Sequence, residues 1–449
     1  MMDGDARVML RRLSSEWNVP LSAGLEISDR CNEVCVHCYQ EQGRKGEMTT
    51  EELFRVLDEL AAMGVLLLTL SGGEATLRKD FLQIVEYARS KGFAVRLFTN
   101  GLTMTRELAQ SLGKLAVQMV EISVYSTQAE THDFVTGVRG SFEKTIAGVR
   151  NLVEAGVGVT IKSPVMNVNE HELADYAAFA RALGVEYSVS PSEIMAREGG
   201  DRTPEAFEMS DRGRVSALRD LLTPWPDACG VQPERPLDSA PCGAGSGLHI
   251  EPNGELQPCT MLEFDLGHAL RDGIGNAHST NERAVALRQL TWANLHGCRD
   301  CALRLFCEHC YSSALTQSGD ALGPYPSGCR GAKLKYEARM GRALEIVARP
   351  DGSTSLGPYQ ERSDGAFQAV DDVVTEADDA LAARLGWTRR SSAALPAVGI
   401  VVRPGDLVQI RRPGRKQSKL ERIPDRPDAQ ALAAAAEVRT GPTQDRVAR

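Results

Sequence analysis

The chain has 449 residues and a formal net charge of -9, from 51 basic and 60 acidic side chains. This length suggests two or three domains of roughly 150 residues, and the mild excess of acid argues against binding nucleic acid or membrane surfaces. No stretch approaches the ~18 uninterrupted apolar residues of a membrane helix, and residues 1–20 lack the apolar core of a secretory signal. We therefore expect a cytoplasmic protein, whose 11 cysteines stay reduced. Metal or cluster ligation is then the first explanation for so many thiols.

The first half of the chain alternates extended runs with helical patterns. The predicted strands are 24–29, 65–70, 93–98, 118–124, 157–161 and 185–189, and the predicted helices are one beginning at 49 and 81–91, 106–115, 142–155 and 170–183. Thr49 and Glu52 form a capping box, and the run 65–70 is almost wholly apolar, as in a strand buried on both faces. Such alternation predicts a parallel sheet or barrel, whose chemistry lies at the carboxyl ends of its strands.

Three cysteines stand close together directly after the first predicted strand. Cys31, Cys35 and Cys38 fall within eight residues. A closed structural zinc site needs four ligands, so three thiolates leave one position open on a single metal. Three thiolates around a [4Fe–4S] cluster likewise leave one iron free for a small ligand. Ligand softness does not separate zinc from an iron–sulfur cluster, so spacing alone leaves both open.

The next three strands are also followed by residues suited to binding. Gly72, Gly73 and Glu74 follow the second strand, Asn100 follows the third, and Ser123 ends the fourth. Glycines allow backbone to approach a ligand closely. Glu74 alone would be an ordinary solvated loop residue, while Asn100 and Ser123 would be a turn residue and a core hydroxyl. Their shared place at one edge of the sheet favours a binding site there.

The Cys-x3-Cys-x2-Cys loop, with Gly-Gly-Glu after the second strand, resembles the radical S-adenosylmethionine (SAM) enzymes over about residues 24–191. The resemblance implies an α/β fold, a (β/α)6 partial TIM barrel. It also implies that the three cysteines hold a [4Fe–4S] cluster whose open iron binds SAM, the source of a 5′-deoxyadenosyl radical that abstracts hydrogen from a substrate. Glu74 would pair with the methionine ammonium. The other expected cofactor contacts are Gly72, Gly73, Asn100 and Ser123.

Two positions depart from the family's usual pattern. His37 stands directly before the third cysteine, where the family usually has an aromatic residue near the adenine. Thr136 replaces an arginine that is common before the fourth helix of the barrel. Arg139 is a candidate to replace that arginine, so the contact to the methionine carboxylate stays open.

Seven further cysteines form a second block. They are Cys242, Cys259, Cys298, Cys301, Cys307, Cys310 and Cys329. Read alone, the two Cys-x2-Cys pairs would also fit zinc knuckles. A hairpin is expected around 252–254. In order and spacing the series resembles the SPASM extension of radical SAM enzymes, which holds two auxiliary [4Fe–4S] clusters, although two residues stand before Cys310 where the family usually has three.

The resemblance implies that Cys242, Cys259 and Cys310 hold an inner auxiliary cluster and that the other four thiols of the block hold an outer one. The inner cluster then lacks a fourth ligand. Cys229 is either that ligand or free, and if it is free the inner cluster keeps an open iron for substrate. His249 and His309 are possible ligands, but lone histidines beside cysteines are more often structural.

We predict four parts of the chain. They are an N-terminal segment (1–23), the partial barrel (24–215), the small cysteine-rich SPASM domain (216–345) and a poorly defined, partly disordered tail (346–449). Within the tail, 349–365 is typical of a linker, 370–385 of an acidic helix and 399–410 of a strand. The basic stretch 403–426 would suit an acidic leader peptide, although a solvated tail is the commoner case.

SPASM extensions mostly accompany peptide or protein substrates. The resemblance therefore implies an enzyme that abstracts hydrogen from a residue of a ribosomally made peptide or protein, ending in a cross-link or another oxidative change. Alternatives are formylglycine formation in a sulfatase and side-chain chemistry on a tetrapyrrole. A non-catalytic iron–sulfur or zinc scaffold is the alternative of another class.

The expected partners follow from this reading. They are a low-potential electron donor of flavodoxin or ferredoxin type and, since 23 residues before the barrel are too few for a peptide-recognition domain, a separate leader-binding protein.

Overall fold

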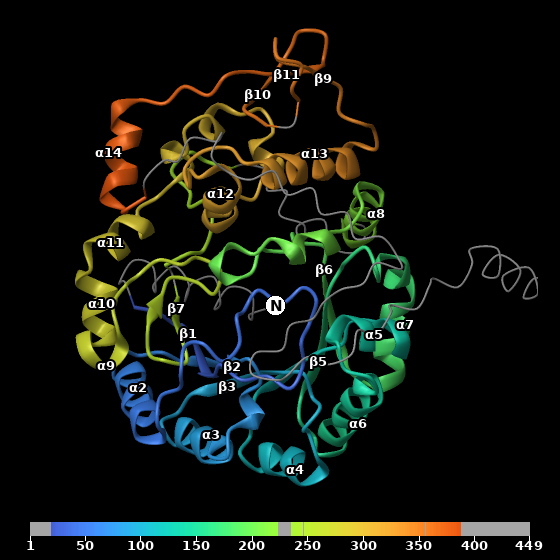
Figure 1. Ribbon diagram of the computed structural model, residues 1–449, viewed down its shortest axis with the longest axis vertical. Helices are drawn as coiled ribbons and strands as arrows, with labels where there is room; N and C mark the ends of the chain where they lie inside the picture. The colour runs from blue at the N-terminus through green and yellow to red at the C-terminus, as the bar shows by residue number, and fades with distance from the viewer. Residues whose placement is uncertain (1–18, 223–234, 246, 355, 388–449) are drawn as a thin grey trace, which may run out of the picture. The chain divides into compact units, whose positions relative to one another are not determined.

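The computed structural model describes residues 19–222, 235–245, 247–354 and 356–387 (Figure 1). All of these belong to the first of two compact units into which the chain divides, residues 1–398. Cys229 and the predicted features at 399–410 and 403–426 lie outside the described residues. In the described part, no helix is both long enough and apolar enough to cross a membrane.

Six parallel strands and their helices form the first part of the fold. The strands are β1 (Ser22–Ser28), β2 (Leu67–Gly72), β3 (Ala94–Thr99), β4 (Met119–Ser123), β5 (Val159–Pro164) and β6 (Glu186–Ser190). The helices are α2 (Thr50–Ala62), α3 (Phe81–Ser90), α4 (Arg106–Lys114), α5 (Ala129–Thr136), α6 (Ser141–Glu154) and α7 (Leu173–Leu183). Neighbouring strands pair in chain order and in parallel, and the helices lie outside them (Figure 1). The predicted (β/α)6 partial barrel is confirmed.

Local signals place these elements to within a few residues. The capping box of α2 is present, because the Thr49 hydroxyl accepts from Glu52 N at 3.2 Å and the Glu52 carboxylate accepts from Thr49 N at 2.8 Å. Strand β2 begins two residues later than predicted. Leu68 and Leu70 are fully buried, but Leu67 is 44% exposed. The expectation of burial on both faces is therefore wrong at the amino end of this strand.

Helix α5 has no counterpart among the predicted elements. It ends at Gly137, whose φ of 67° is the left-handed conformation that glycine adopts without strain. Asp133, on α5, then accepts from Phe142 N at 2.9 Å. This carboxylate satisfies a free N–H group in the first turn of α6, so α5 also fixes where α6 begins.

The cysteine-rich region joins the same sheet. Strands β7 (Leu248–Ile250) and β8 (Leu256–Gln257) form an antiparallel hairpin, which confirms the turn predicted around 252–254. Strand β7 also pairs in parallel with β1, which the sequence did not indicate. The sheet therefore has eight strands in the order β6-β5-β4-β3-β2-β1-β7-β8.

The remaining elements cover the chain beyond β6. They are α8 (Asp211–Leu222), α9 (Ala269–Asp272), α10 (Ile274–Thr280), α11 (Glu282–Arg288), α12 (Tyr311–Ser318), α13 (Pro326–Met340), β9 (Ile346–Val347), β10 (Tyr359–Glu361), β11 (Phe367–Ala369) and α14 (Glu376–Arg384). Strands β9, β10 and β11 form a separate small sheet. The prediction of a linker at 349–365 is wrong where β10 lies, and the acidic helix expected at 370–385 is confirmed from Glu376 onward.

Candidate cofactor-binding site

A cavity of about 700 Å³ lies at the carboxyl ends of β1 to β4. Every residue predicted for the cofactor site lines it, with the exception of Glu74. These lining residues are Cys31, Cys35, Cys38, Gly72, Gly73, Asn100 and Ser123. The structure therefore brings together side chains from four separate strand ends, at the edge where parallel folds carry their chemistry.

Glu74 lies behind the wall of this cavity and is 1% exposed. Its Oε1 accepts from Thr76 N at 3.1 Å, from the Thr76 hydroxyl at 2.6 Å and from the Thr99 hydroxyl at 2.8 Å. Its Oε2 accepts from Asn100 N at 2.7 Å. Three of these bonds fall on Oε1 and one on Oε2, so Oε2 can still accept from a further donor. The carboxylate ties the turn after β2 to the end of β3, and its pairing with the methionine ammonium stays a prediction.

The two glycines serve a close approach between protein segments. A Cβ on Gly72 would come within 2.2 Å of Ser28 O, and one on Gly73 would come within 2.5 Å of Arg30 O. Gly73 N donates to Ser28 O at 2.8 Å. The expected approach to a ligand is therefore not the main constraint, because these glycines let the end of β2 pack against the start of the cysteine loop.

Asn100 connects the third strand to the same loop. Its Nδ2 donates to Asn32 Oδ1 at 2.6 Å and lies 3.8 Å from Cys31 Sγ. The Thr145 hydroxyl donates to Asn100 O at 2.9 Å, which holds the residue from its other side. Asn100 therefore orients the first cysteine as well as lining the cavity.

Among the other residues that line the cavity, three carry polar or aromatic side chains close to the thiols. Glu33 is 2% exposed and its Oε1 has no hydrogen-bond partner in the described part of the chain. Burial raises the pKa of this carboxyl to about 8. Tyr125 lies with its hydroxyl 3.8 Å from Cys35 Sγ, and the ring of His37 meets that of Tyr125 edge-on at 4.8 Å. For Glu33, the signal in the sequence is a carboxylate between the first and second cysteines of the loop.

The position left by the missing family arginine is not refilled by Arg139. Thr136 is buried, and its hydroxyl lies 2.7 Å from that of Ser141. Arg139 is exposed and does not line the cavity. The structure thus gives Arg139 no contact with a ligand in this cavity.

The thiol set suits a cluster with an open side. Burial raises the pKa of Cys31 to about 12 and also raises the pKa of Cys35 and of Cys38. Such thiols are unreactive until a metal centre stabilises the thiolate. In the described residues no three His, Cys, Asp or Glu side chains converge on a single metal ion, as a zinc knuckle would require. Three thiols at the edge of an open cavity fit a cluster that also binds a small ligand.

One thiol of the second block, Cys259, lines the same cavity. A second cavity of about 580 Å³ shares Tyr39, Cys259 and Thr260 with the first. Cys242 Sγ accepts from Ala244 N at 3.4 Å, and Cys310 N donates to the Tyr325 hydroxyl at 3.0 Å. Cys259 is therefore the inner thiol that faces both cavities.

The outer thiols lie under the segment that follows α13. Gly357 N donates to Cys329 Sγ at 3.2 Å, and Tyr359 N donates to Cys301 Sγ at 3.4 Å. Neither of the two cavities is lined by Cys298, Cys301, Cys307 or Cys329. Backbone therefore covers at least Cys301 and Cys329.

The two histidines of this region have partners that suit a structural role. His249 Nε2 lies 3.2 Å from Glu26 Oε1, and His309 Nε2 lies 2.7 Å from Ala321 O. These contacts leave neither Nε2 atom available to a metal.

Comparison with known proteins identifies the family. Residues 25–180 match the model of the Radical SAM superfamily. The mycofactocin maturase MftC of Mycolicibacterium smegmatis is 32% identical over 378 residues, which cover 76% of this chain and 90% of that protein. The chain belongs to the radical SAM superfamily. It is therefore a radical SAM enzyme, and a [4Fe–4S] cluster and SAM are the cofactors that this family uses.

Other similar proteins extend this result. The subtilosin biosynthesis protein AlbA of Bacillus subtilis is 28% identical over 327 residues, covering 71% of this chain and 70% of AlbA. An AdoMet-dependent heme synthase of Methanosarcina barkeri is 36% identical over 170 residues, covering 37% of this chain and 49% of that protein. The solved structure of anSMEcpe with bound AdoMet and a peptide has a TM-score of 0.56 at 18% identity, covering 72% of this chain and 98% of that one. This last likeness shows a shared fold.

Proposed function

We propose that this radical SAM enzyme abstracts hydrogen from a residue of a ribosomally made peptide or protein, leaving a cross-link or another oxidative change. The observation that carries the proposal is the match to MftC, since it covers 76% of this chain and so extends beyond the barrel into the cysteine-rich region. A likeness confined to the barrel would speak only for the shared radical chemistry.

We assign Cys31, Cys35 and Cys38 as the ligands of the cluster that binds SAM. When bound, the cluster and SAM supply a 5′-deoxyadenosyl radical that removes hydrogen from a substrate carbon. The chain's own residues shape the space for this. Asn100 orients Cys31, while His37 and Tyr125 pack edge-on and give the cavity wall an aromatic surface.

The second cysteine block provides for the rest of the oxidation. Forming a new bond at a C–H carbon removes one hydrogen atom, one further electron and one proton. We propose that two auxiliary [4Fe–4S] clusters give that electron a destination. The inner cluster would be held by Cys242, Cys259 and Cys310, and the outer one by Cys298, Cys301, Cys307 and Cys329. The position of Cys259, which lines both cavities, supports an inner cluster close to the proposed SAM site.

Two kinds of partner complete the proposal. Reductive cleavage of SAM needs a low-potential electron donor, for which a flavodoxin or ferredoxin type is suited. A precursor peptide also needs to be recognised, and we propose a separate leader-binding protein for this.

Anaerobic reconstitution tests the proposed chemistry. The wild-type chain should hold iron and sulfide for three clusters, roughly twelve iron atoms, and should release 5′-deoxyadenosine only when a reductant is present. Substituting the three loop cysteines by alanine should abolish this release. Zinc in place of iron, or release that survives the triple substitution, would overturn the proposal.

A second candidate function is chemistry on a tetrapyrrole, because two relatives are named heme synthases. One match covers 37% of this chain and the other covers 67% at 25% identity, whereas the MftC match covers 76% at 32% identity. Mass spectrometry distinguishes the two. The enzyme should change the mass of a precursor peptide encoded beside its gene and leave tetrapyrrole substrates unchanged, whereas the reverse pattern would favour the second candidate.

A further inference from the structure

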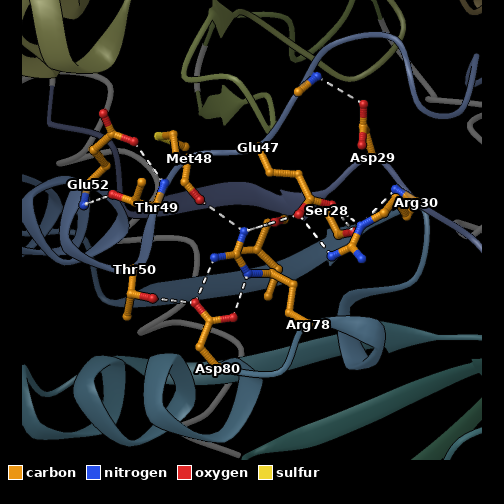
Figure 2. A network of polar contacts seen from close by, with 12 residues as sticks. Ser28, Asp29, Arg30, Glu47, Met48, Thr49, Thr50, Glu52, Arg78 and Asp80 are labelled. Atoms are coloured by element: carbon orange, nitrogen blue, oxygen red, sulfur yellow. Dashed lines mark hydrogen bonds and ion pairs between the residues drawn. The ribbon is translucent and has the colours of Figure 1, made fainter.

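One buried arginine joins the two ends of the cysteine loop. The loop leaves the sheet at Ile27 and returns to α2 at Met48, and Arg78 Nη1 donates to the carbonyl oxygens of both, at 2.9 and 3.0 Å (Figure 2). The Arg78 side chain is 6% exposed. A single guanidinium therefore bridges the neck of the loop that carries all three cofactor-side thiols.

Two helix starts hold this arginine in place. Arg78 Nε donates to Asp80 Oδ1 at 2.9 Å, and Arg78 Nη2 donates to Asp80 Oδ2 at 2.7 Å. Asp80 is the N-cap of α3 and also accepts from the Thr50 hydroxyl, in the first turn of α2, at 2.6 Å. This two-point pairing needs the planar fork of arginine, which a lysine lacks. The bridge is thus anchored to elements that do not belong to the loop.

A second layer joins the two arms of the neck directly. Glu47 Oε1 accepts from the Ser28 hydroxyl at 2.6 Å and from Arg30 Nε at 2.9 Å (Figure 2). Arg30 Nη2 donates to Glu47 Oε2 at 3.0 Å, and Arg78 Nη1 lies 3.6 Å from the same oxygen. Arg30 is 56% exposed on its side chain, so this layer should contribute less than the buried bridge.

The network acts on the loop without touching the cavity. None of Ser28, Arg30, Glu47, Arg78 or Asp80 lines the first cavity. The loop between the two stems is long, and with its ends free its thiols would sample many separations. Outer contacts that orient ligands typically change metal affinity by about 10- to 100-fold when they are removed.

We propose that Arg78 is a positioning residue, which closes the neck of the cysteine loop so that Cys31, Cys35 and Cys38 keep their cluster-binding arrangement. The inference rests on the proposed role of these cysteines as ligands. It goes beyond that role by assigning a function to a residue that meets neither the thiols nor the cavity.

The test compares Arg78→Lys with a matched control, Arg214→Lys. Arg214 is similarly buried, at 4% exposure of its side chain, pairs with Glu208 through one nitrogen and donates to Ser192 O at 3.3 Å. It therefore offers a buried arginine with an ion pair and a carbonyl contact outside the cysteine loop. Reconstituted holoenzymes are exposed to an iron chelator, and the electron paramagnetic resonance signal that changes on adding SAM is followed with time. Unfolding midpoints are measured on the same samples.

Arg78→Lys should lose the SAM-sensitive signal on the order of tenfold faster than wild type, while the auxiliary signals decay at the wild-type rate. Arg214→Lys should lower the unfolding midpoint and leave the decay unchanged. Equal decay in Arg78→Lys and wild type, or equal acceleration in both variants, would overturn the inference.

A milder variant keeps the inference testable if Arg78→Lys does not fold. Glu47→Gln should then speed the loss by a smaller factor, and an unchanged rate there would count against the inference. A wild-type enzyme that shows no SAM-sensitive signal would instead overturn the proposed function itself.

Discussion

The thiols at the barrel mouth and the outer thiols of the second block are almost all partly buried, with Cys298 fully so, yet the two groups differ in what covers them. Cys31, Cys35 and Cys38 line an open cavity of about 700 Å³. Cys301 and Cys329 instead accept hydrogen bonds from backbone N–H groups at 3.4 and 3.2 Å. An open side permits a ligand on the metal centre, whereas backbone donors shield a cluster and raise its reduction potential. This difference agrees with the proposed function, in which the first group would hold the cluster that binds SAM and the second would hold a cluster that stores an electron.

The largest expected effect comes from removing one thiol of each group. Cys35→Ala should reduce 5′-deoxyadenosine release to background, because the SAM-binding cluster is lost. Cys298→Ala should keep reductant-dependent release while product formation from a peptide fails, because the electron acceptor is damaged. Both products are quantified by liquid chromatography and mass spectrometry. Abolished release in Cys298→Ala would erase the functional difference between the two groups.

A buried histidine behind the wall of the first cavity should also make the fold sensitive to acid. His132 is fully buried and its Nδ1 accepts from Tyr125 N at 3.2 Å. Burial lowers its pKa to about 4, from 6.5. A histidine whose folded pKa is depressed contributes fully above the unfolded pKa, and stability falls as the pH drops from 6.5 toward 4. The loss should reach about 3 kcal/mol.

Denaturant unfolding between pH 7.5 and 4.5 measures this slope. His132→Asn, which keeps an acceptor but does not titrate there, should flatten it. His171 has a side chain that is 65% exposed, so His171→Asn should leave the slope as in wild type. An unchanged slope in His132→Asn would assign the acid sensitivity to other groups.

A substitution of Glu74, which lies behind the cavity wall, distinguishes a structural role from a direct contact with the cofactor. Glu74→Gln replaces one acceptor oxygen by an NH2 group that faces donors such as the Thr99 hydroxyl and Asn100 N. Leaving buried donors unpaired should cost about 2 kcal/mol of unfolding free energy. The affinity of the folded holoenzyme for SAM should change little, as equilibrium binding would show. A stable variant with a large loss of SAM affinity would support the direct contact expected from sequence.

The barrel was predictable because its signals are local. The apolar runs, the helical stripes and the Thr49–Glu52 capping box each act within a few residues, and the thiol spacing carried the family. The orientation of Glu74 was not predictable, because its four donors come from β3 and from the turn after β2. The pairing of β7 with β1 joins segments far apart in the chain. Long-range contacts of this kind leave no periodic signal.

The segment 349–365 also shows a feature that the sequence could not predict. Glycine, serine, proline and charge in 349–365 are typical of a linker. In the structure this stretch instead supplies the two N–H groups that reach Cys301 and Cys329. The backbone of this segment donates hydrogen bonds to the two thiols, and side-chain composition does not reveal this because any residue except proline provides an N–H donor.

The smallest expected effect tests this cover over the outer thiols. Arg349 Nη1 donates to Leu356 O at 2.6 Å, and its Nη2 donates to Gly357 O at 3.1 Å. Arg349 also donates to Val370 O. Arg349→Ala should loosen the segment above Cys329. We expect the outer cluster to bleach in air a few-fold faster, in line with a loss of about 1 kcal/mol for these hydrogen bonds at a partly exposed site.

Arg362, in the same segment, is the matched control, because it pairs only locally with Asp364 at 3.1 Å and is 43% exposed on its side chain. Arg362→Ala should bleach at the wild-type rate. In both variants the SAM-sensitive signal of the first cluster should stay unchanged, since neither arginine lines the first cavity. Faster decay of that signal in Arg349→Ala would mean that the segment over the outer thiols stabilises the whole fold and does not shelter one cluster. The contrast between an open centre and a sheltered one would then lose its physical basis.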